Sequence, residues 1–161
     1  YRDAIRHIVD ETRNGMDAGL TIDELAHKVT LPDHLAEKPH LREYYGRVDF
    51  YVRAYFVGTM GWFDGNPTSL SPLSPKGEAM RFIDLAGGNA AVLSSAQKAL
   101  KDGDFQWALQ LLDRLLNVEY EVANAKQLKA EALRAHAVAQ INCPTRHYYI
   151  QYAKELEQGD I

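Results

Sequence analysis

Apolar residues recur every three or four positions along most of the chain, which is the spacing of one face of an α-helix. In the first segment Ile5, Ile8, Val9 and Thr12 follow this spacing. Comparable apolar stripes continue to the last residues. We therefore predict an all-α protein with roughly seven helices.

Capping signals mark the ends of the first two helices. Asn14-Gly15 predicts the end of the first helix, because glycine readily adopts the left-handed conformation of a C-cap. Thr21 and Glu24 have the spacing of a capping box, in which the two residues satisfy each other's backbone N–H groups. Pro32 ends the second helix, and residues 31–39 are expected to form a polar connector.

The most aromatic helix is expected over residues 41–60. Its aromatic residues are Tyr44, Tyr45, Phe50, Tyr51, Tyr55 and Phe56. Aromatic side chains on several sides of one helix predict burial on several sides, or contact with a partner surface. A strand is the alternative, because these residues favour strands, but the length of the segment and the lack of strict alternation favour a helix.

Residues 61–75 are expected to be irregular, because an Asp-Gly pair and an Asn-Pro step are typical of turns. A new helix then begins with Ser74 as its N-cap and Pro75 at its first position, and it ends at Gly87-Gly88.

The second half has the pattern of antiparallel helix pairs, with helices expected over residues 89–101, 105–117, 122–141 and 146–158. An Ala-rich helix, a turn at Gly103 and a Leu-rich helix resemble one tetratricopeptide-type hairpin. The predicted fold is an all-α helical bundle of antiparallel helix pairs, with a tetratricopeptide-like hairpin in the second half.

Composition and charge exclude several functional classes. The 161 residues, 46% of them hydrophobic and 25% charged, are ordinary for one globular domain or one lobe of a longer chain. A net charge of −4 argues against a generally basic nucleic-acid-binding surface. The single cysteine, Cys143, excludes an internal disulfide framework and a multi-cysteine zinc site. The apolar stretch 52–63 is interrupted by Arg53 and is too short for a transmembrane helix, which needs about 20 apolar residues.

The histidine and cysteine residues form no recognisable metal-binding or catalytic motif in the sequence. None of the six histidines has H-x-H or H-E-x-x-H spacing, so no local zinc motif is present, and we expect solvated surface histidines. A metal site assembled from distant residues stays open. Cys143 and His147 are four positions apart, but we expect Pro144 to break any common helix face. A thiol without a role is therefore favoured.

Two further groups have both a binding and a structural interpretation. Asp64 and Asn66 could bind a ligand, but such side chains also close turns on their own backbone, and the structural use is favoured. Tyr44 and Tyr45 with Arg47 and Arg53 could donate to an anion. An interface or core role is favoured for these residues too.

Several motifs together resemble the dimerisation domain of the metallo-β-lactamase-type alkylsulfatases, and the resemblance covers nearly the whole chain. The most specific motif is Gly61-Trp-Phe-Asp-Gly-Asn-Pro67. The other matching stretches are Tyr44-Tyr-Gly46, Val52-Arg-Ala54, Leu70, Pro72-Leu-Ser-Pro75, Gly87-Gly88, Gly103-Asp-Phe-Gln-Trp107, Arg146-His-Tyr-Tyr149 and Ala153-Lys-Glu-Leu156.

This resemblance implies a parent enzyme of three parts: an N-terminal zinc domain of β-lactamase fold, this helical domain and a C-terminal sterol-carrier-like domain. The family hydrolyses alkyl sulfate esters at a two-zinc site whose H-x-H-x-D-H motif belongs to the first domain. Residues 1–161 are thus expected to be one dimerisation domain excised from a longer chain at Tyr1, with no catalytic or metal-binding residue. The cellular compartment stays open, and periplasmic or secreted locations are included.

The resemblance also directs the assignment of site residues. This segment is expected to form a homodimer, to contact the zinc domain of the same polypeptide and to supply part of the cleft wall for an alkyl sulfate. Tyr45 and Tyr55 are the candidates for the cleft. The structural motif comprises Gly61, Trp62, Phe63, Asp64, Gly65, Asn66 and Pro67, and within it Trp62 and Phe63 are expected to be buried anchors.

The alternative is a free-standing helical interaction module of tetratricopeptide type that binds a peptide in a groove. It is supported only by the hairpin centred on Gly103 and does not explain the motif of residues 61–67.

Overall fold

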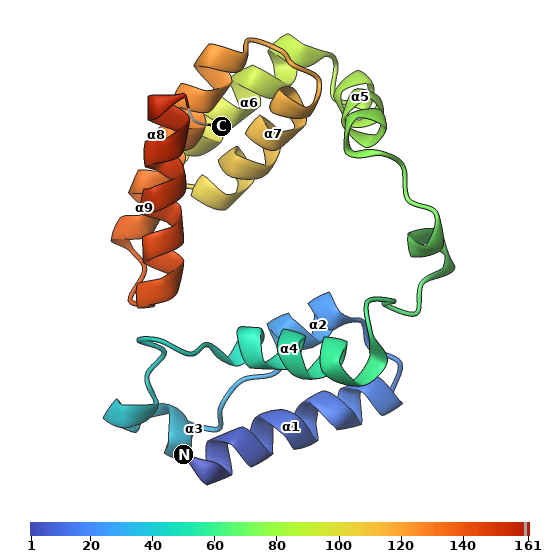
Figure 1. Ribbon diagram of the computed structural model, residues 1–161, viewed down its shortest axis with the longest axis vertical. Coiled ribbons are helices and arrows are strands. Elements are labelled where there is room, and N and C mark those ends of the chain that lie inside the picture. The colour runs from blue at the N-terminus through green and yellow to red at the C-terminus, as the bar shows by residue number, and fades with distance from the viewer. Residues whose placement is uncertain (160) are drawn as a thin grey trace. The chain divides into compact units, whose positions relative to one another are not determined.

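The computed structural model describes residues 1–159 and 161, and these residues confirm the all-α prediction (Figure 1). Over this range the chain forms nine α-helices and two 3₁₀ helices and no strand. It divides into two compact units, residues 1–72 and 73–161, each of which is described separately below. No helix in the described ranges is long and apolar enough to cross a membrane.

The first unit is built around its aromatic helix. Its elements in order are α1 (Arg2–Asp17), α2 (Ile22–Lys28), α3 (Asp33–Ala36), η1 (Pro39–Leu41), α4 (Val48–Met60) and η2 (Pro67–Leu70). Helices α1 and α2 both pack against α4. Their shared core consists of Ile8, Leu25, Val29, Val52 and Phe56, which are at most 7% exposed.

The first helix extends beyond Gly15, so the predicted C-cap at this residue is wrong. Helix α1 continues to Asp17, and the glycine with a left-handed φ of 78° is Gly19. Gly15 is buried, and a Cβ atom there would overlap the Cδ2 atom of Leu25. Gly15 therefore allows α2 to approach α1 closely, a role that depends on a residue ten positions away.

The predicted capping box at the start of α2 is confirmed. The Thr21 backbone N–H donates to the Glu24 carboxylate at 2.8 Å, and the Glu24 backbone N–H donates to the Thr21 hydroxyl at 3.3 Å. The Thr21 backbone N–H and, next in effect, the Thr21 hydroxyl, which also donates to this carboxylate at 2.8 Å, lower the pKa of Glu24.

Helix α4 begins at Val48, seven residues later than the position predicted from the aromatic pattern. The Glu43 carboxylate accepts a hydrogen bond of 2.6 Å from the Val48 backbone N–H, so it caps the helix from five residues upstream. Tyr44 and Tyr45 consequently precede the helix. The prediction that they share one helix with Tyr51 and Tyr55 is wrong.

Side-chain hydrogen bonds hold the turn that follows α4. The Asp64 carboxylate accepts from the Asn66 backbone N–H at 2.8 Å and from the Ser69 hydroxyl at 2.7 Å. Asn66 in turn accepts from the Thr68 backbone N–H at 3.1 Å and caps η2, a short helix that the sequence pattern did not predict. The hydrogen bond from Ser69, followed by that from Asn66, lowers the pKa of the Asp64 carboxyl.

The second unit consists of five helices: α5 (Pro75–Leu85), α6 (Asn89–Asp102), α7 (Phe105–Asn117), α8 (Val122–Val138) and α9 (Cys143–Gln158). The successive helices from α6 to α9 pack against one another, and α5 packs on α7. The turn between α6 and α7 has the predicted form, with Gly103 in the left-handed conformation and Asp104 as the N-cap of α7. The predicted helix pairs are present.

The last turn of this unit differs from the prediction. Helix α8 ends at Val138 and α9 begins at Cys143, because the buried Asn142 side chain accepts from the Thr145 backbone N–H at 3.0 Å and from its hydroxyl at 2.8 Å. Pro144 lies in the first turn, where a missing N–H group costs no helical hydrogen bond. Residues expected to break the helix therefore start it.

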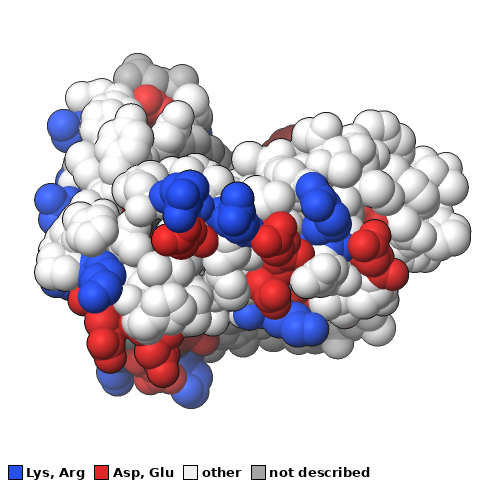
Figure 2. Space-filling view, turned by 90° about the horizontal axis from the view of Figure 1, so that it is seen from below, with Lys and Arg blue, Asp and Glu red and all other residues white. Residues whose placement is uncertain are grey.

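Alanine and leucine side chains form the interior of the second unit, and ion pairs at its surface join neighbouring helices. Buried alanines on α8 and α9, including Ala132 and Ala153, allow these helices to approach closely. Arg134 pairs with Glu157 across α8 and α9 at 2.6 Å, and Lys129 with Asp113 across α8 and α7 at 2.5 Å. Figure 2 shows one face of the molecule, on which acidic and basic side chains are interspersed.

Replacing Gly15 by alanine should destabilise the first unit. Alanine favours the helix by about 1 kcal/mol over glycine, but overpacking against the buried Leu25 costs about 1–3 kcal/mol, so a net loss of about 1 kcal/mol is expected. The matched control is Asn14→Ala at the adjacent, exposed position of α1, which should stabilise by a few tenths of a kcal/mol. Urea unfolding measures both, and a stabilising Gly15→Ala would contradict the close packing.

The Asp64 turn should make stability depend on pH. A carboxyl with a pKa lowered below its usual 3.8 in the folded chain stabilises the fold above that pH, and the contribution disappears as the pH falls through the lowered value. Asp64→Asn should therefore lower the urea midpoint at pH 7, and the difference from wild type should shrink towards pH 3. Asp10→Asn, in an exposed position of α1, is the control, and a pH-independent Asp64→Asn effect would contradict the assignment.

Candidate functional site

The two tyrosines predicted for a substrate cleft lie in different local structures. Tyr45 precedes α4 and is 78% exposed. Tyr55 lies on α4, and its hydroxyl accepts a hydrogen bond of 3.0 Å from Arg13 Nη2 on α1. The Tyr55 hydroxyl keeps its own hydrogen for a second partner, because a phenol both donates and accepts.

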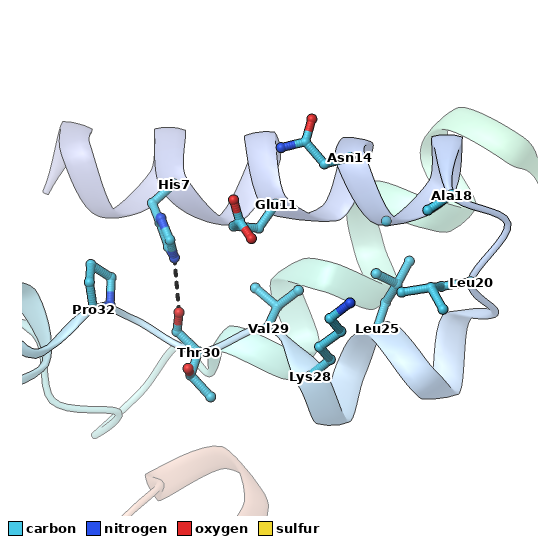
Figure 3. A pocket seen from close by; sticks show the side chains of 11 residues that line it. His7, Glu11, Asn14, Ala18, Leu20, Leu25, Lys28, Val29, Thr30 and Pro32 are labelled. Carbon is cyan, nitrogen blue, oxygen red and sulfur yellow. Dashed lines mark hydrogen bonds between the residues drawn. The ribbon is translucent and has the colours of Figure 1, made fainter.

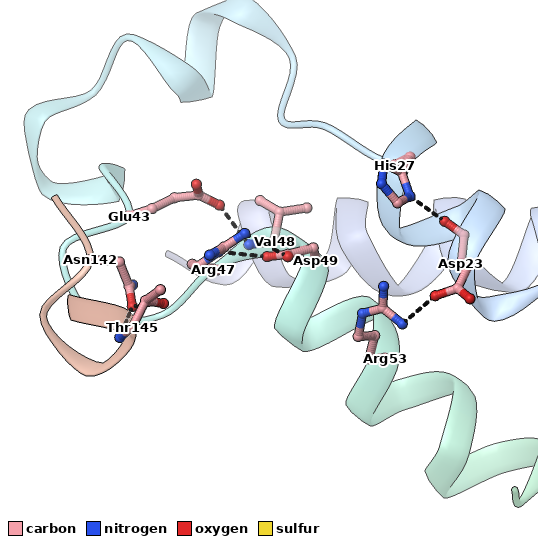
Figure 4. Close-up of polar contacts among 9 residues, drawn as sticks. All are labelled: Asp23, His27, Glu43, Arg47, Val48, Asp49, Arg53, Asn142 and Thr145. Carbon is pink, nitrogen blue, oxygen red and sulfur yellow. Dashed lines mark hydrogen bonds and ion pairs between the residues drawn. The ribbon is translucent and has the colours of Figure 1, made fainter. Parts of the chain in front are cut away.

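The arginines of the predicted anion group are paired with carboxylates (Figure 4). Arg47 donates from Nε and Nη2 to the two oxygens of Asp49 at 2.9 and 2.7 Å, and its guanidinium lies 4.6 Å from the ring centroid of Phe50. Arg53 pairs with Asp23 of α2 at 2.7 Å. Both arginines line one cavity of about 560 Å³ within the first unit, and their carboxylate partners offset their positive charge.

A second cavity of about 390 Å³ lies between α1 and α2 and the segment that follows α2 (Figure 3). His7 Nε2 lies 2.9 Å from the Thr30 carbonyl oxygen. This contact fixes Nε2 as the protonated nitrogen and ties the connector to α1. Sequence analysis did not single out His7, and this contact across 23 positions leaves no local signal.

Trp62 is 75% exposed, so the prediction that it is a buried anchor of this chain is wrong. Its ring meets Phe63 edge-on, with centroids 5.8 Å apart. Phe63 is half-buried and lines a cavity with Phe56 and Met60. The polar side chains of the same turn, Asp64 and Asn66, bind their own backbone as predicted.

The described residues bring no group of three or more potential metal ligands together. Cys143 and His147 are both exposed and both lie on α9. The prediction that Pro144 separates them from a common helix is wrong, because proline is tolerated in the first turn.

The side of α4 that points away from its core residues Val52 and Phe56 carries no charged residue. Helical spacing places Phe50, Ala54, Val57 and Gly58 on this side, and all four are exposed. Phe50 is 42% and Val57 49% exposed. We call these four residues the outer face of α4. Sequence analysis noted the aromatic residues of the helix but missed the small residues between them.

Comparisons with known proteins agree on one family. The sequence profile of the alkyl sulfatase dimerisation family matches residues 21–159. A linear primary-alkylsulfatase from Pseudomonas sp. is 43% identical over 99% of this chain and 31% of its own length. An alkyl/aryl-sulfatase of Saccharomyces cerevisiae, BDS1, is 31% identical over 98% of this chain and 24% of its own.

A solved structure gives the same result. The stereoselective inverting sec-alkylsulfatase Pisa1 from Pseudomonas sp. superposes with a TM-score of 0.90 at 34% identity, over 98% of this chain and 25% of that one. The chain thus spans less than a third of the length of these relatives. Because the profile matches most of the chain and the residues of the resemblance lie within the match, the chain belongs to the alkyl sulfatase dimerisation family.

Proposed function

We propose that this chain is the dimerisation domain of a zinc-dependent alkylsulfatase that hydrolyses alkyl sulfate esters to an alcohol and sulfate. The observation that carries the proposal is the similarity to the linear primary-alkylsulfatase, 43% identical over 99% of this chain. An (R)-specific secondary-alkylsulfatase from Pseudomonas sp. is also 34% identical over 98% of the chain. The class of substrate common to both names is an alkyl sulfate ester.

The zinc of this enzyme belongs, in our proposal, to a domain outside this chain. This assignment is supported by the described residues, among which no three potential metal ligands come together. A metal centre supplies a water or hydroxide nucleophile at neutral pH. The residues of this chain instead hold two copies of the enzyme together, contact the zinc domain of the same polypeptide and line part of the substrate cleft.

Tyr45 and Tyr55 are the residues that we propose for the cleft wall. A phenol donates a hydrogen bond to a sulfate oxygen, and its ring offers apolar surface to an alkyl chain. The exposure of Tyr45 and the remaining hydrogen of the Tyr55 hydroxyl support this role. Packing alone is the competing explanation for both residues.

The free-standing tetratricopeptide-like module is not favoured. The family match extends over residues 21–159 and so accounts for both units and for the turn at residues 61–67. The module explains only the hairpin of α6 and α7.

The first test compares the full-length protein with the chain of 161 residues. The full-length protein should release sulfate from a panel of primary and secondary alkyl sulfates and lose this activity when zinc is removed by a chelator. The shorter chain should release no sulfate, with or without added zinc, because its described residues gather no ligand set. Turnover by the purified shorter chain that rises with added zinc would contradict the assignment of the chemistry to another domain.

The second test replaces Tyr45 and Tyr55 separately by phenylalanine in the full-length enzyme. Loss of a hydrogen bond to a charged group costs about 1.5–3 kcal/mol, so kcat/KM should fall about 10- to 100-fold with little change in melting temperature. Tyr148→Phe removes an exposed phenol of α9 and is the control that should keep full activity. Wild-type kinetics for both cleft variants on every ester tried would show that the two tyrosines are packing residues.

A further inference from the structure

We propose that the outer face of α4 packs against the same face of α4 in a second copy of this chain, so that the two helices cross at Ala54 and Gly58. This inference rests on the proposed function, because it assigns the dimerisation to one surface.

The first argument is the distribution of polar groups around α4. Its two charged residues are Asp49 and Arg53, and both form ion pairs within the first unit. The Thr59 hydroxyl donates to the Tyr55 carbonyl of the same helix at 2.8 Å. The four residues of the outer face are therefore apolar, and the guanidinium that lies beside them, that of Arg47 at 4.6 Å from the ring centroid of Phe50, is already paired with Asp49. An exposed apolar face opposite a buried one is typical of a helix that is covered by a partner.

The shape of the outer face indicates what covers it. Ala54 and Gly58 lie one turn apart, with the exposed side chains of Phe50 and Val57 beside them. A Cβ at Gly58 would meet no atom of this chain within 4 Å. Small residues between large ones allow another helix to approach closely, and the larger side chains then fill the space beside the crossing.

A second copy of this chain is the partner that agrees with the uncharged outer face and with the description of the family. In a two-fold symmetric dimer each residue near the axis lies close to its own equivalent, so a charged residue there would meet a like charge. The outer face has none. The matching family is described by its dimerisation, and its profile includes all of α4.

The surrounding surface extends the contact. A helix of 13 residues is about 20 Å long, and its single face covers only part of the roughly 800 Å² that each partner buries in a stable interface. Met60, the last residue of α4, and Trp62, two positions after it, are 60% and 75% exposed and add apolar surface at this end of the helix. Aromatic residues and methionine are enriched in such interfaces.

The test uses the full-length protein and measures its mass by sedimentation equilibrium. Wild type should be a dimer, whereas Ala54→Arg and Ala54→Glu should each halve the mass because like charges meet at the axis. Mixing the two variants should restore a dimer that contains one copy of each. Ala54→Ser should keep the dimer. So should Ala90→Arg, the control at an exposed alanine of α6.

The possible outcomes separate this inference from the proposed function. A monomeric wild type would overturn the dimerisation itself. A dimeric wild type together with dimeric Ala54→Arg would overturn only the assignment to α4, and another part of the polypeptide would then cover the outer face. If circular dichroism shows that the charged variants do not fold, Ala54→Cys with a bismaleimide linker replaces them. Cross-linking of Ala54→Cys above the level of the unmodified protein supports the interface, and its absence in a dimeric protein overturns it.

Discussion

The constraint on which the first unit depends is that α4 has more apolar surface than its neighbours cover. Helices α1 and α2 pack against it and bury Val52 and Phe56, which lie on one side. Burial of such side chains supplies about 1.5–3 kcal/mol each, and this side holds the unit together. The opposite side is exposed and supplies little of that energy within the chain, and our proposal assigns it to contact with a second copy.

In the second unit, neighbouring helices pack their apolar surfaces against one another within the unit itself. Each of the helices from α6 to α8 has packed neighbours on two sides, and their leucines and alanines form continuous clusters. Its charged residues join neighbouring helices, as Arg134 and Glu157 do across α8 and α9. This unit has the internal packing of a scaffold, whereas α4 of the first unit leaves Phe50 and Val57 exposed on one face. The family motif at residues 61–67 also belongs to the first unit.

Sequence predicted the features that depend on neighbouring residues. The capping box at Thr21 and Glu24 and the turn at Gly103 agree with the structure, because each is decided within a few positions. The start of α4 and the role of Gly15 could not be predicted in this way. Glu43 caps Val48 from outside the helix, and Gly15 is required by the side chain of Leu25 on another helix. For the candidate site, sequence supplied Tyr45 and Tyr55, but it placed Tyr45 on a helix that begins only after it.

The turn after α4 is fixed by local hydrogen bonds, yet it also positions a large side chain that stays exposed. Its polar residues are occupied by their own backbone and by Ser69, and Gly61 and Gly65 adopt φ values of 82° and 88° that other residues rarely tolerate. The turn is therefore specified closely by its sequence, although its indole, Trp62, is left exposed. An exposed tryptophan on a tightly specified turn contributes little to the stability of this chain. The physical consequence of the motif is to hold a large apolar side chain in a fixed position beside the end of α4.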